Sequence, residues 1–233
     1  DLHSFPTRRS SDLPGSFTKD VYDKLVFVME KGMNVITSAE EMAYPQAQEP
    51  ELAKKLDECA KKNGVSVMGT GINPGLIMDL LVILWTAACE EVNHITSRRV
   101  NSLSPFGPAV MEEQGIGISV DEFNARKADG TMAGHVGFAE SVGMMCETLG
   151  WKLDEFGQDM EPIVTDVDRK SPYGFAPAGS VAGVAMKGWG IVDGERKLDM
   201  DHPQQIEPEQ VGVDTGDYVI LDAVNLADRK SVV

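Results

Sequence analysis

In the first third of the chain, segments with helix-like spacing of apolar residues alternate with short strand-like segments. Residues 18–31 carry apolar side chains at helical spacing, which predicts a helix that Thr18 caps and Gly32 stops. Three further elements are predicted in the same way: a strand at 33–37, a helix at 51–63 that ends at Gly64, and a strand at 65–68. Helices that alternate with short apolar strands are typical of a parallel sheet covered on both faces. We therefore expect the later part of a doubly wound domain.

The pattern changes after an almost wholly apolar helix, which is predicted at 76–88. Strand-like runs follow at 92–100, 163–167, 181–185, 189–192 and 214–221, with a tight hairpin signal at 192–195 and a polar loop at 201–205. Two helices are also expected, one from a capping box of Ser119 and Glu122 to about Ala128, and one after Phe138. The economical architecture for this half is an antiparallel sheet with helices on one side.

These elements give an α/β fold class with two domains. Residues 14–90 are expected to form the C-terminal part of a doubly wound, Rossmann-like parallel sheet, and residues 91–227 an α+β substrate-binding or oligomerisation domain. Residues 1–13 and 228–233 resemble translated sequencing adapter, because the same DNA read in opposite directions can encode 7–12 and 228–233. Two unrelated basic tails are the alternative. If the ends are adapter, the natural sequence is interrupted at both sides.

Composition narrows the class of partner. The chain has 233 residues with 37 acidic and 21 basic side chains, a formal net charge of −16. This acidity argues against a nucleic-acid or anionic-membrane binder, since such binding needs clustered Lys and Arg. Cys59, Cys89 and Cys146 are too widely spaced to indicate disulfides or a zinc site, and the segment 76–88 is too short to span a membrane. We expect a cytoplasmic protein with a small-molecule partner, no metal, no nucleic acid and no membrane.

The loop after Thr37 is one candidate for a ligand site, because ligands of doubly wound sheets bind at the carboxyl ends of the strands. It presents Ser38, Glu40 and Glu41. The two adjacent carboxylates could bind an ammonium group or take a proton. The alternative is that one or both begin the next helical turn, where a negative charge suits the helix dipole.

The loop at 69–75 is the second candidate. Gly71 and Gly75 let the backbone approach a cofactor ring, Pro74 constrains the chain, and Asn73 offers both a donor and an acceptor. A tight turn without a ligand is the alternative. No G-x-G-x-x-G lies between a leading strand and a helix, so a dinucleotide domain here would lack its phosphate-binding half.

Basic and titratable side chains mark two later segments. Arg98, Arg99 and Asn101 are expected where a strand meets the small-residue loop at 102–108. An arginine there can hold a carboxylate with a bidentate fork, and because adjacent strand residues point to opposite faces, one arginine of the pair is expected at the surface. His135 lies beside two glycines at a helix start and is the best-placed acid or base among the histidines. A structural histidine is the alternative.

Together these segments resemble the 2,4-diaminopentanoate dehydrogenase family. The resemblance lies in residues 36–45, 69–79, 99–101, 104–108, 134–138 and 202–205, in the same order, and covers nearly all of 14–227. That family is similar in architecture to dihydrodipicolinate reductase. The paired-histidine and lysine motif of the reductase is missing, however, because residues 98–107 contain neither His nor Lys. Imine reduction is therefore the weaker alternative.

The resemblance implies oxidative deamination of the C4 amine of 2,4-diaminopentanoate, with NAD or NADP as the hydride acceptor and ammonia as a product. It implies substrate contacts from Glu40, Glu41, Asp79, Arg99, Asn101 and Ser104, a base at His135 or Glu41, and a nicotinamide ring against Ser38, Gly71, Asn73, Pro74 and Gly75. A homo-oligomer is expected for the full-length protein, and this chain by itself is expected to be inactive. A non-catalytic ligand-binding or oligomerising module is a further alternative.

Overall fold

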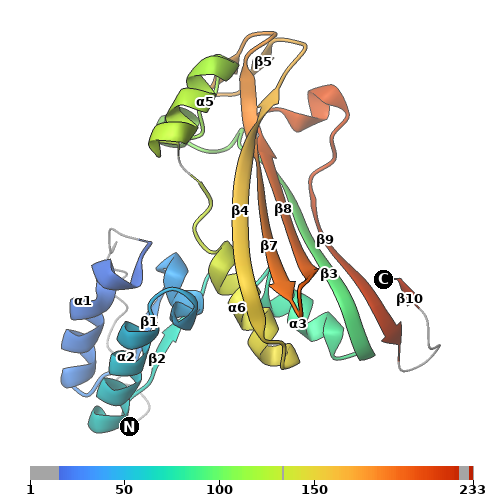
Figure 1. Cartoon of the computed structure of the whole chain (residues 1–233). Coiled ribbons are helices and arrows are strands. Elements are labelled where there is room, and N and C mark those ends of the chain that lie inside the picture. Colours follow the sequence, from blue (N-terminus) through green and yellow to red (C-terminus); the bar gives the residue numbers. More distant parts are fainter. Residues whose placement is uncertain (1–15, 133, 226–230, 233) are drawn as a thin grey trace, which may run out of the picture.

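The computed structural model describes residues 16–132, 134–225 and 231–232. Residues 1–13 and most of 228–233, which the sequence assigns to adapter, lie outside these ranges. The chain forms two bodies, a small helical one at the N-terminal side and a larger one built on a tall sheet (Figure 1). The fold is α/β, as the sequence predicts.

The small body contains α1 (Thr18–Glu30), β1 (Val35–Thr37), α2 (Pro50–Asn63) and β2 (Val67–Gly69), with two 3-10 turns, η1 (Glu40–Ala43) and η2 (Pro45–Ala47), between β1 and α2. The two strands pair in parallel, with Thr37 opposite Gly69, so the predicted alternation of helix and strand is confirmed. Its core joins Leu25 and Met29 of α1 to Leu56 of α2. These side chains are apolar at helical spacing, and burial of that stripe holds the two helices together.

The ends of α1 and α2 show which capping predictions hold. Gly64 adopts a left-handed conformation with φ of 65° after α2, as predicted. The prediction that Thr18 caps α1 is wrong, because Phe17 occupies the N-cap position and Thr18 is the first helical residue. The Glu41 carboxylate accepts a hydrogen bond from the Thr18 backbone N–H instead. A side chain from another segment thus satisfies the exposed start of α1.

The large body is a six-stranded sheet in the order β10-β9-β3-β8-β7-β4. Its strands are β3 (Cys89–Ser102), β4 (Leu153–Val164), β7 (Val181–Val192), β8 (Glu195–Gln205), β9 (Gly216–Asn225) and β10 (Ser231–Val232), and a short separate pair is formed by β5 (Arg169–Lys170) and β6 (Phe175–Ala176). The helices are α3 (Leu80–Thr86), α4 (Pro108–Glu113), α5 (Val120–Asp129) and α6 (Phe138–Leu149), and η3 (Pro208–Val211) is a 3-10 turn. The predicted hairpin joins β7 to β8 through Asp193 and Gly194, both with positive φ.

Several predictions for this half are wrong. The sheet is mixed, not antiparallel, because β3 and β8 run parallel at its centre. The predicted polar loop at 201–205 is the end of β8, where His202 and Gln205 are buried. The predicted helix at 76–88 is confined to α3, because Asp79 caps the helix at Leu80. The strand predicted at 163–167 starts ten residues earlier and ends at Val164, in β4 (Leu153–Val164).

One face of the sheet, here the inner face, carries the core. Phe138 and Val142 of α6 pack against β7 at Gly188 and Gly190, where an added Cβ would lie 2.9 Å from each side chain. Val82 of α3 joins the same cluster. The absence of side chains at these two glycines lets α6 approach the sheet closely. The core therefore fixes the start of α6, which follows His135 by three residues, relative to the strands.

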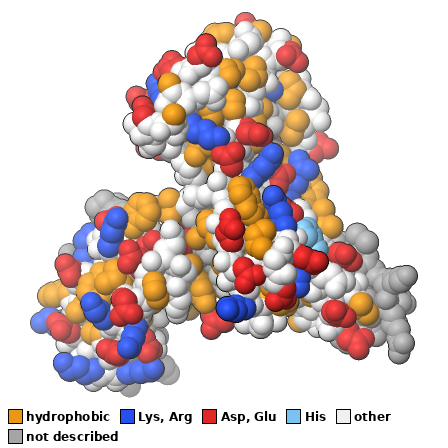
Figure 2. All heavy atoms as spheres, in the orientation of Figure 1, with side chains coloured by type: hydrophobic (Ala, Val, Ile, Leu, Met, Phe, Trp, Pro, Cys, Tyr) orange, Lys and Arg blue, Asp and Glu red, His pale blue; other side chains and the backbone are white. Residues whose placement is uncertain are grey.

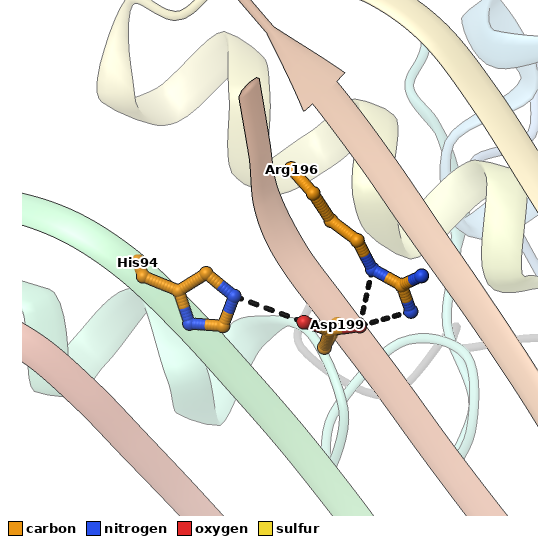
Figure 3. A network of polar contacts seen from close by, with 3 residues as sticks. All are labelled: His94, Arg196 and Asp199. Carbon is orange, nitrogen blue, oxygen red and sulfur yellow. Dashed lines mark hydrogen bonds and ion pairs between the residues drawn. The ribbon is translucent and has the colours of Figure 1, made fainter.

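The opposite face, here the outer face, carries ion pairs. Figure 3 shows Asp199 of β8 between two partners: its carboxylate accepts a hydrogen bond from Arg196 Nε at 2.6 Å and lies 2.9 Å from His94 Nε2. Arg98 of β3 lies 3.2 Å from Asp201 of β8. These groups are half-exposed, so each pair contributes little to stability. Arg98 faces outward and Arg99 inward, as strand alternation predicts.

On the face shown in Figure 2, basic and acidic side chains are interspersed over α1 and α2. None of the helices in the described ranges combines the length and the apolar character that crossing a membrane requires.

Candidate active site

The two predicted ligand loops meet at one edge of the small body. Because β1 and β2 are parallel and in register, their carboxyl ends lie side by side. A pocket of about 480 Å³ opens there, lined by Ser38, Glu40, Thr70, Gly71, Ile72, Asn73 and Pro74. Five of the residues that the sequence marks as candidates are therefore brought together, one pair from the first loop and three from the second.

Glycine backbones shape this pocket. Gly75 has φ of 117°, and an added Cβ would lie 2.5 Å from the Gly71 nitrogen, so the 71–75 loop closes tightly on itself. Gly69 lets β2 approach η1, where an added Cβ would overlap the Met42 carbonyl oxygen. Side chains at these positions would push the two loops apart. Gly75 does not line the pocket.

Asn73 supplies the most informative polar atom of the pocket. Its Nδ2 lies 3.3 Å from the sulfur of Met78. Its Oδ1 is buried and accepts no hydrogen bond from the residues that the structure describes. A buried amide oxygen without a donor carries a desolvation penalty, which a ligand N–H would remove.

Asp79 has a structural place in this arrangement. It is fully buried, and its carboxylate accepts hydrogen bonds from Gly75 N (2.7 Å), Leu80 N (2.5 Å) and Ser141 Oγ (3.0 Å). These contacts join the 71–75 loop, the start of α3 and α6 around one carboxylate. Both oxygens of Asp79 accept hydrogen bonds within the fold, and its predicted role as an ammonium ligand stays a prediction.

Glu40 and Glu41 stand in the first turn of η1, the alternative that the sequence left open. Glu41 is buried with its carboxylate at the start of α1. Glu40 is half-buried and lines the pocket. The two glutamates thus have different environments. Glu40 is accessible to a ligand, and Glu41 is bonded to the start of α1.

A second polar group lies on the inner face near the ends of β3 and β8. Arg99 Nε lies 3.5 Å from Asp217 of β9, and Asn101 stands opposite Gln204 of β8. His202 is buried, and its Nδ1–H donates to the Arg99 carbonyl oxygen at 2.9 Å. A carbonyl can only accept, so this bond places the proton of the neutral ring on Nδ1. Burial lowers the pKa of His202 to about 4, so the ring is neutral near pH 7.

His135 lies against this group. Its ring meets His202 edge to face at a centroid distance of 5.3 Å and Phe138 at 4.6 Å. It also lines a small pocket of about 140 Å³ with Lys127, Gly134, Phe138, Gln158, Asp159, Met160 and Met186. Burial, followed by the charges of His202 and Arg99, lowers the pKa of His135 to about 3. Its Nε2 is buried and has no hydrogen-bond partner in the described part of the chain.

Backbone packing connects the two polar groups. Gly137, with φ of 125°, lies so close to Pro74 that an added Cβ would be 2.5 Å from the proline ring. Pro74 lines the first pocket, and Gly137 is two residues from His135. The loop pocket therefore lies against the segment that leads from His135 to α6.

Ser104 stands apart from this site chemistry. Its Oγ accepts a hydrogen bond from the Glu207 backbone N–H at 2.8 Å. This bond ties the segment after β3 to the segment after β8. A substrate contact from Ser104 stays a prediction.

Two buried groups escaped sequence reasoning. His202 lay in a segment that was expected to be a loop, and its only signal was the unusual run with Pro203 and two glutamines. Glu140 of α6 is fully buried, and its Oε1 accepts a hydrogen bond from Gln48 Nε2 at 2.8 Å. Burial raises the pKa of Glu140, and the charges of Glu41 and Glu40 add to this effect. A glutamate in a helix usually lies on the solvent-exposed side, so no pattern in the sequence indicates that Glu140 is buried.

Within the described ranges, no group of three or more His, Cys, Asp or Glu side chains is arranged to hold a metal ion.

Known proteins resemble this chain in sequence and in fold. The family described as "2,4-diaminopentanoate dehydrogenase C-terminal domain" matches residues 76–229. A 2,4-diaminopentanoate dehydrogenase of Acetoanaerobium sticklandii is 73% identical over 210 residues, which make up 90% of this chain and 60% of that protein. An amine dehydrogenase structure from Mycobacterium smegmatis has the same fold, with a TM-score of 0.69 and 21% identity over 89% of this chain and 60% of its own. The chain thus spans 60% of the length of both relatives.

Proposed function

Because this chain belongs to the 2,4-diaminopentanoate dehydrogenase family, we propose that the protein oxidatively deaminates the C4 amine of 2,4-diaminopentanoate to 2-amino-4-oxopentanoate. The observation that carries the proposal is the contact of Pro74 with Gly137, which joins a pocket suited to a nicotinamide to an arginine and histidine group suited to an amino acid. Water supplies the oxygen of the ketone, and ammonia leaves.

The loop pocket fits a nicotinamide ring. Its carboxamide N–H₂ could donate to the unpartnered Oδ1 of Asn73, and the glycine backbone at Gly71 leaves room for a flat ring beside Ser38. When bound, NAD or NADP would supply the hydride acceptor. The protein's part is to hold the substrate carbon beside that pocket and to exclude water until the amine has been oxidised.

Charge complementarity orients the substrate. Its carboxylate suits Arg99, which pairs with Asp217 through Nε, with Asn101 on the same strand as a further donor. Its ammonium groups suit Glu40 at the pocket wall. Asp79 is not assigned to the substrate here, because its carboxylate already accepts three hydrogen bonds within the fold.

The amine must lose a proton before its carbon can give up a hydride. We assign this proton to the unpartnered Nε2 of His135, with Glu41 as the alternative base. Burial is the main cause of the low pKa of His135, and the charge of Arg99 is the smallest of the three causes, so a substrate carboxylate that neutralises Arg99 removes only the smallest of them.

Activity is tested on the complete protein encoded by the gene that contains this chain. The expected result is NAD(P)-dependent reduction at 340 nm with 2,4-diaminopentanoate, together with stoichiometric release of ammonia. Oxidation of NADPH by the cyclic imine of dihydrodipicolinate would favour the reductase alternative. Binding of dinucleotide without turnover of any diamino acid would favour a non-catalytic module.

Arg99→Met is expected to raise KM for the diamino acid about 10- to 100-fold, since a charge-assisted hydrogen bond contributes about 1.5–3 kcal/mol. Steady-state kinetics with varied substrate, and a titration of NAD(P)H, are the measurements. Affinity for NAD(P)H should not change, because Arg99 does not line the loop pocket. Arg126→Met removes the same charge from exposed α5 and serves as the control. An unchanged KM would remove Arg99 from the carboxylate site.

The protein is further proposed to be cytoplasmic and to act as a homo-oligomer. An acidic chain that acts on a small metabolite supports the first statement. The large sheet, with one face covered by helices and one without, supports the second.

A further inference from the structure

Two consecutive residues of α6 reach the two loops that form the pocket. Ser141 donates to the Asp79 carboxylate at 3.0 Å, and that carboxylate in turn accepts from a backbone N–H of the 71–75 loop. Glu140 accepts a hydrogen bond at 2.8 Å from Nε2 of Gln48, which directly follows η2. Helix α6 is therefore bonded to both loops, to the second through Ser141 and to the segment that continues the first through Glu140.

The contact of α6 with the segment after η1 extends over two helical turns. Glu140, Gly143 and Glu147 lie at helical spacing on one side of α6. An added Cβ at Gly143 would be 2.9 Å from the Tyr44 ring, and the Tyr44 hydroxyl donates to the Glu147 carboxylate. Residues 44–48 follow η1 directly, so these contacts fix the end of that turn.

Glu140 is the buried member of this stripe. It is fully buried, and its Oε2 atom has no hydrogen-bond partner in the described part of the chain. Burial raises the pKa of Glu140, and the negative charges of Glu41 and Glu40 in η1 add to this rise. The hydrogen bond from Gln48 opposes the rise in pKa but does not cancel it. Since burial and like charges both disfavour the ion, the neutral acid is the stable form.

We propose that Glu140 is a positioning residue, which as an uncharged acid holds Gln48 and thereby keeps Glu40 at the wall of the loop pocket. This role rests on the proposed function, in which Glu40 binds an ammonium group of the substrate. A third negative charge beside Glu40 and Glu41 would repel both carboxylates and displace η1. The proton on Glu140 therefore lets α6 pack against η1 and leaves Glu40 as the carboxylate that lines the pocket.

Kinetics of the complete protein test the position of Glu40. Glu140→Ala removes the acceptor of Gln48 and should raise KM for the diamino acid about 3- to 10-fold, the fold-change that corresponds to one hydrogen bond. Glu140→Gln keeps the shape, the neutral charge and the acceptor oxygen, so its KM should stay near the wild-type value. Glu147→Gln makes the same substitution at an exposed position of α6 and serves as the control. A residue that contributed to stability alone would leave the KM of the folded protein unchanged.

Gln48→Ala breaks the same hydrogen bond from an exposed residue, where a variant is expected to fold. It should raise KM by a factor similar to that of Glu140→Ala. The double variant should raise KM no further, because both substitutions remove one shared contact. Thermal unfolding followed by circular dichroism checks that each variant is folded. Fully additive effects, or an unchanged KM in both single variants, would overturn the positioning role.

Infrared spectroscopy tests the proton on Glu140 without any turnover. A protonated carboxylic acid has a carbonyl-stretching band at a frequency where carboxylates and amides do not absorb. The difference spectrum between wild type and Glu140→Gln near neutral pH should contain this band, and the difference spectrum between wild type and Glu147→Gln should not. A missing band would show that Glu140 is ionised and would overturn the inference. A wild-type protein that turns over no diamino acid would instead refute the proposed function, whatever the infrared spectrum shows.

Discussion

Replacing His135 with alanine is expected to lower kcat by about 10²- to 10⁴-fold, the range that general bases contribute. The Nε2 atom of His135 is buried without a partner in the described part of the chain, and the charge of Arg99 acts on the ring. Its loss removes the acceptor for the substrate proton and leaves the nicotinamide pocket unchanged. Stopped-flow and steady-state kinetics on the complete protein measure kcat, and a titration of NAD(P)H should give an unchanged affinity.

Glu41→Gln separates the two candidate bases. The amide oxygen of glutamine can still accept from the Thr18 backbone N–H, so α1 keeps its cap. If His135 is the base, this variant loses far less kcat than His135→Ala. If kcat falls by a similar factor in Glu41→Gln while His135→Ala stays active, Glu41 is the base and the assignment of His135 is wrong.

Asp79→Ala is expected to lower the free energy of unfolding by about 3–5 kcal/mol, because two backbone N–H groups and one hydroxyl lose their buried acceptor. The loss is large since it acts on three segments at once: the 71–75 loop, α3 and α6. Chemical denaturation followed by circular dichroism measures it.

Two matched variants calibrate that loss. Ser141→Ala removes one of the three hydrogen bonds and should cost about 1 kcal/mol. Asp57→Ala removes an exposed carboxylate of α2 that pairs with Lys61, and should change stability by less than about 1 kcal/mol. If Asp79→Ala keeps its stability but raises KM for the diamino acid, Asp79 binds the substrate ammonium after all.

Local pattern was sufficient for the elements with strong periodicity. The helices α1 and α2 bury one apolar stripe each, and a glycine ends α2, so sequence and structure agree on both. The two loops after β1 and β2 were also predictable, because parallel strands place their carboxyl ends at one edge. The pocket that contains Ser38 and Asn73 follows from that single rule.

Strands in a two-faced sheet were harder to predict. β4 is an edge strand, and apolar and polar residues alternate poorly in its polar half. The end of β8 contains His202, Pro203 and two glutamines. These residues are in a strand because hydrogen bonds to neighbouring strands hold them there. Strand neighbours that are distant in sequence determine this structure, so the local spacing of apolar residues does not reveal it.

The polar groups of the site show the same limit. Glu41 and Asp79 are carboxylates that the sequence placed in binding roles, and the structure places them on backbone N–H groups. A carboxylate looks the same in a sequence whether it meets a ligand or a helix start. Only tertiary packing shows which N–H groups lack another acceptor.

The contact between Gly137 and Pro74 has a consequence for how the protein can vary. Neither residue has a rotamer to adjust, so a backbone and a ring set the spacing between the 71–75 loop and His135. Reaction rates fall about 10²-fold for a 1 Å misplacement of reacting groups. Under the proposed function, changes of substrate are then open to the side chains around the site, such as Asn101 and Glu40, while the distance between the proposed hydride acceptor and the proposed base stays constant.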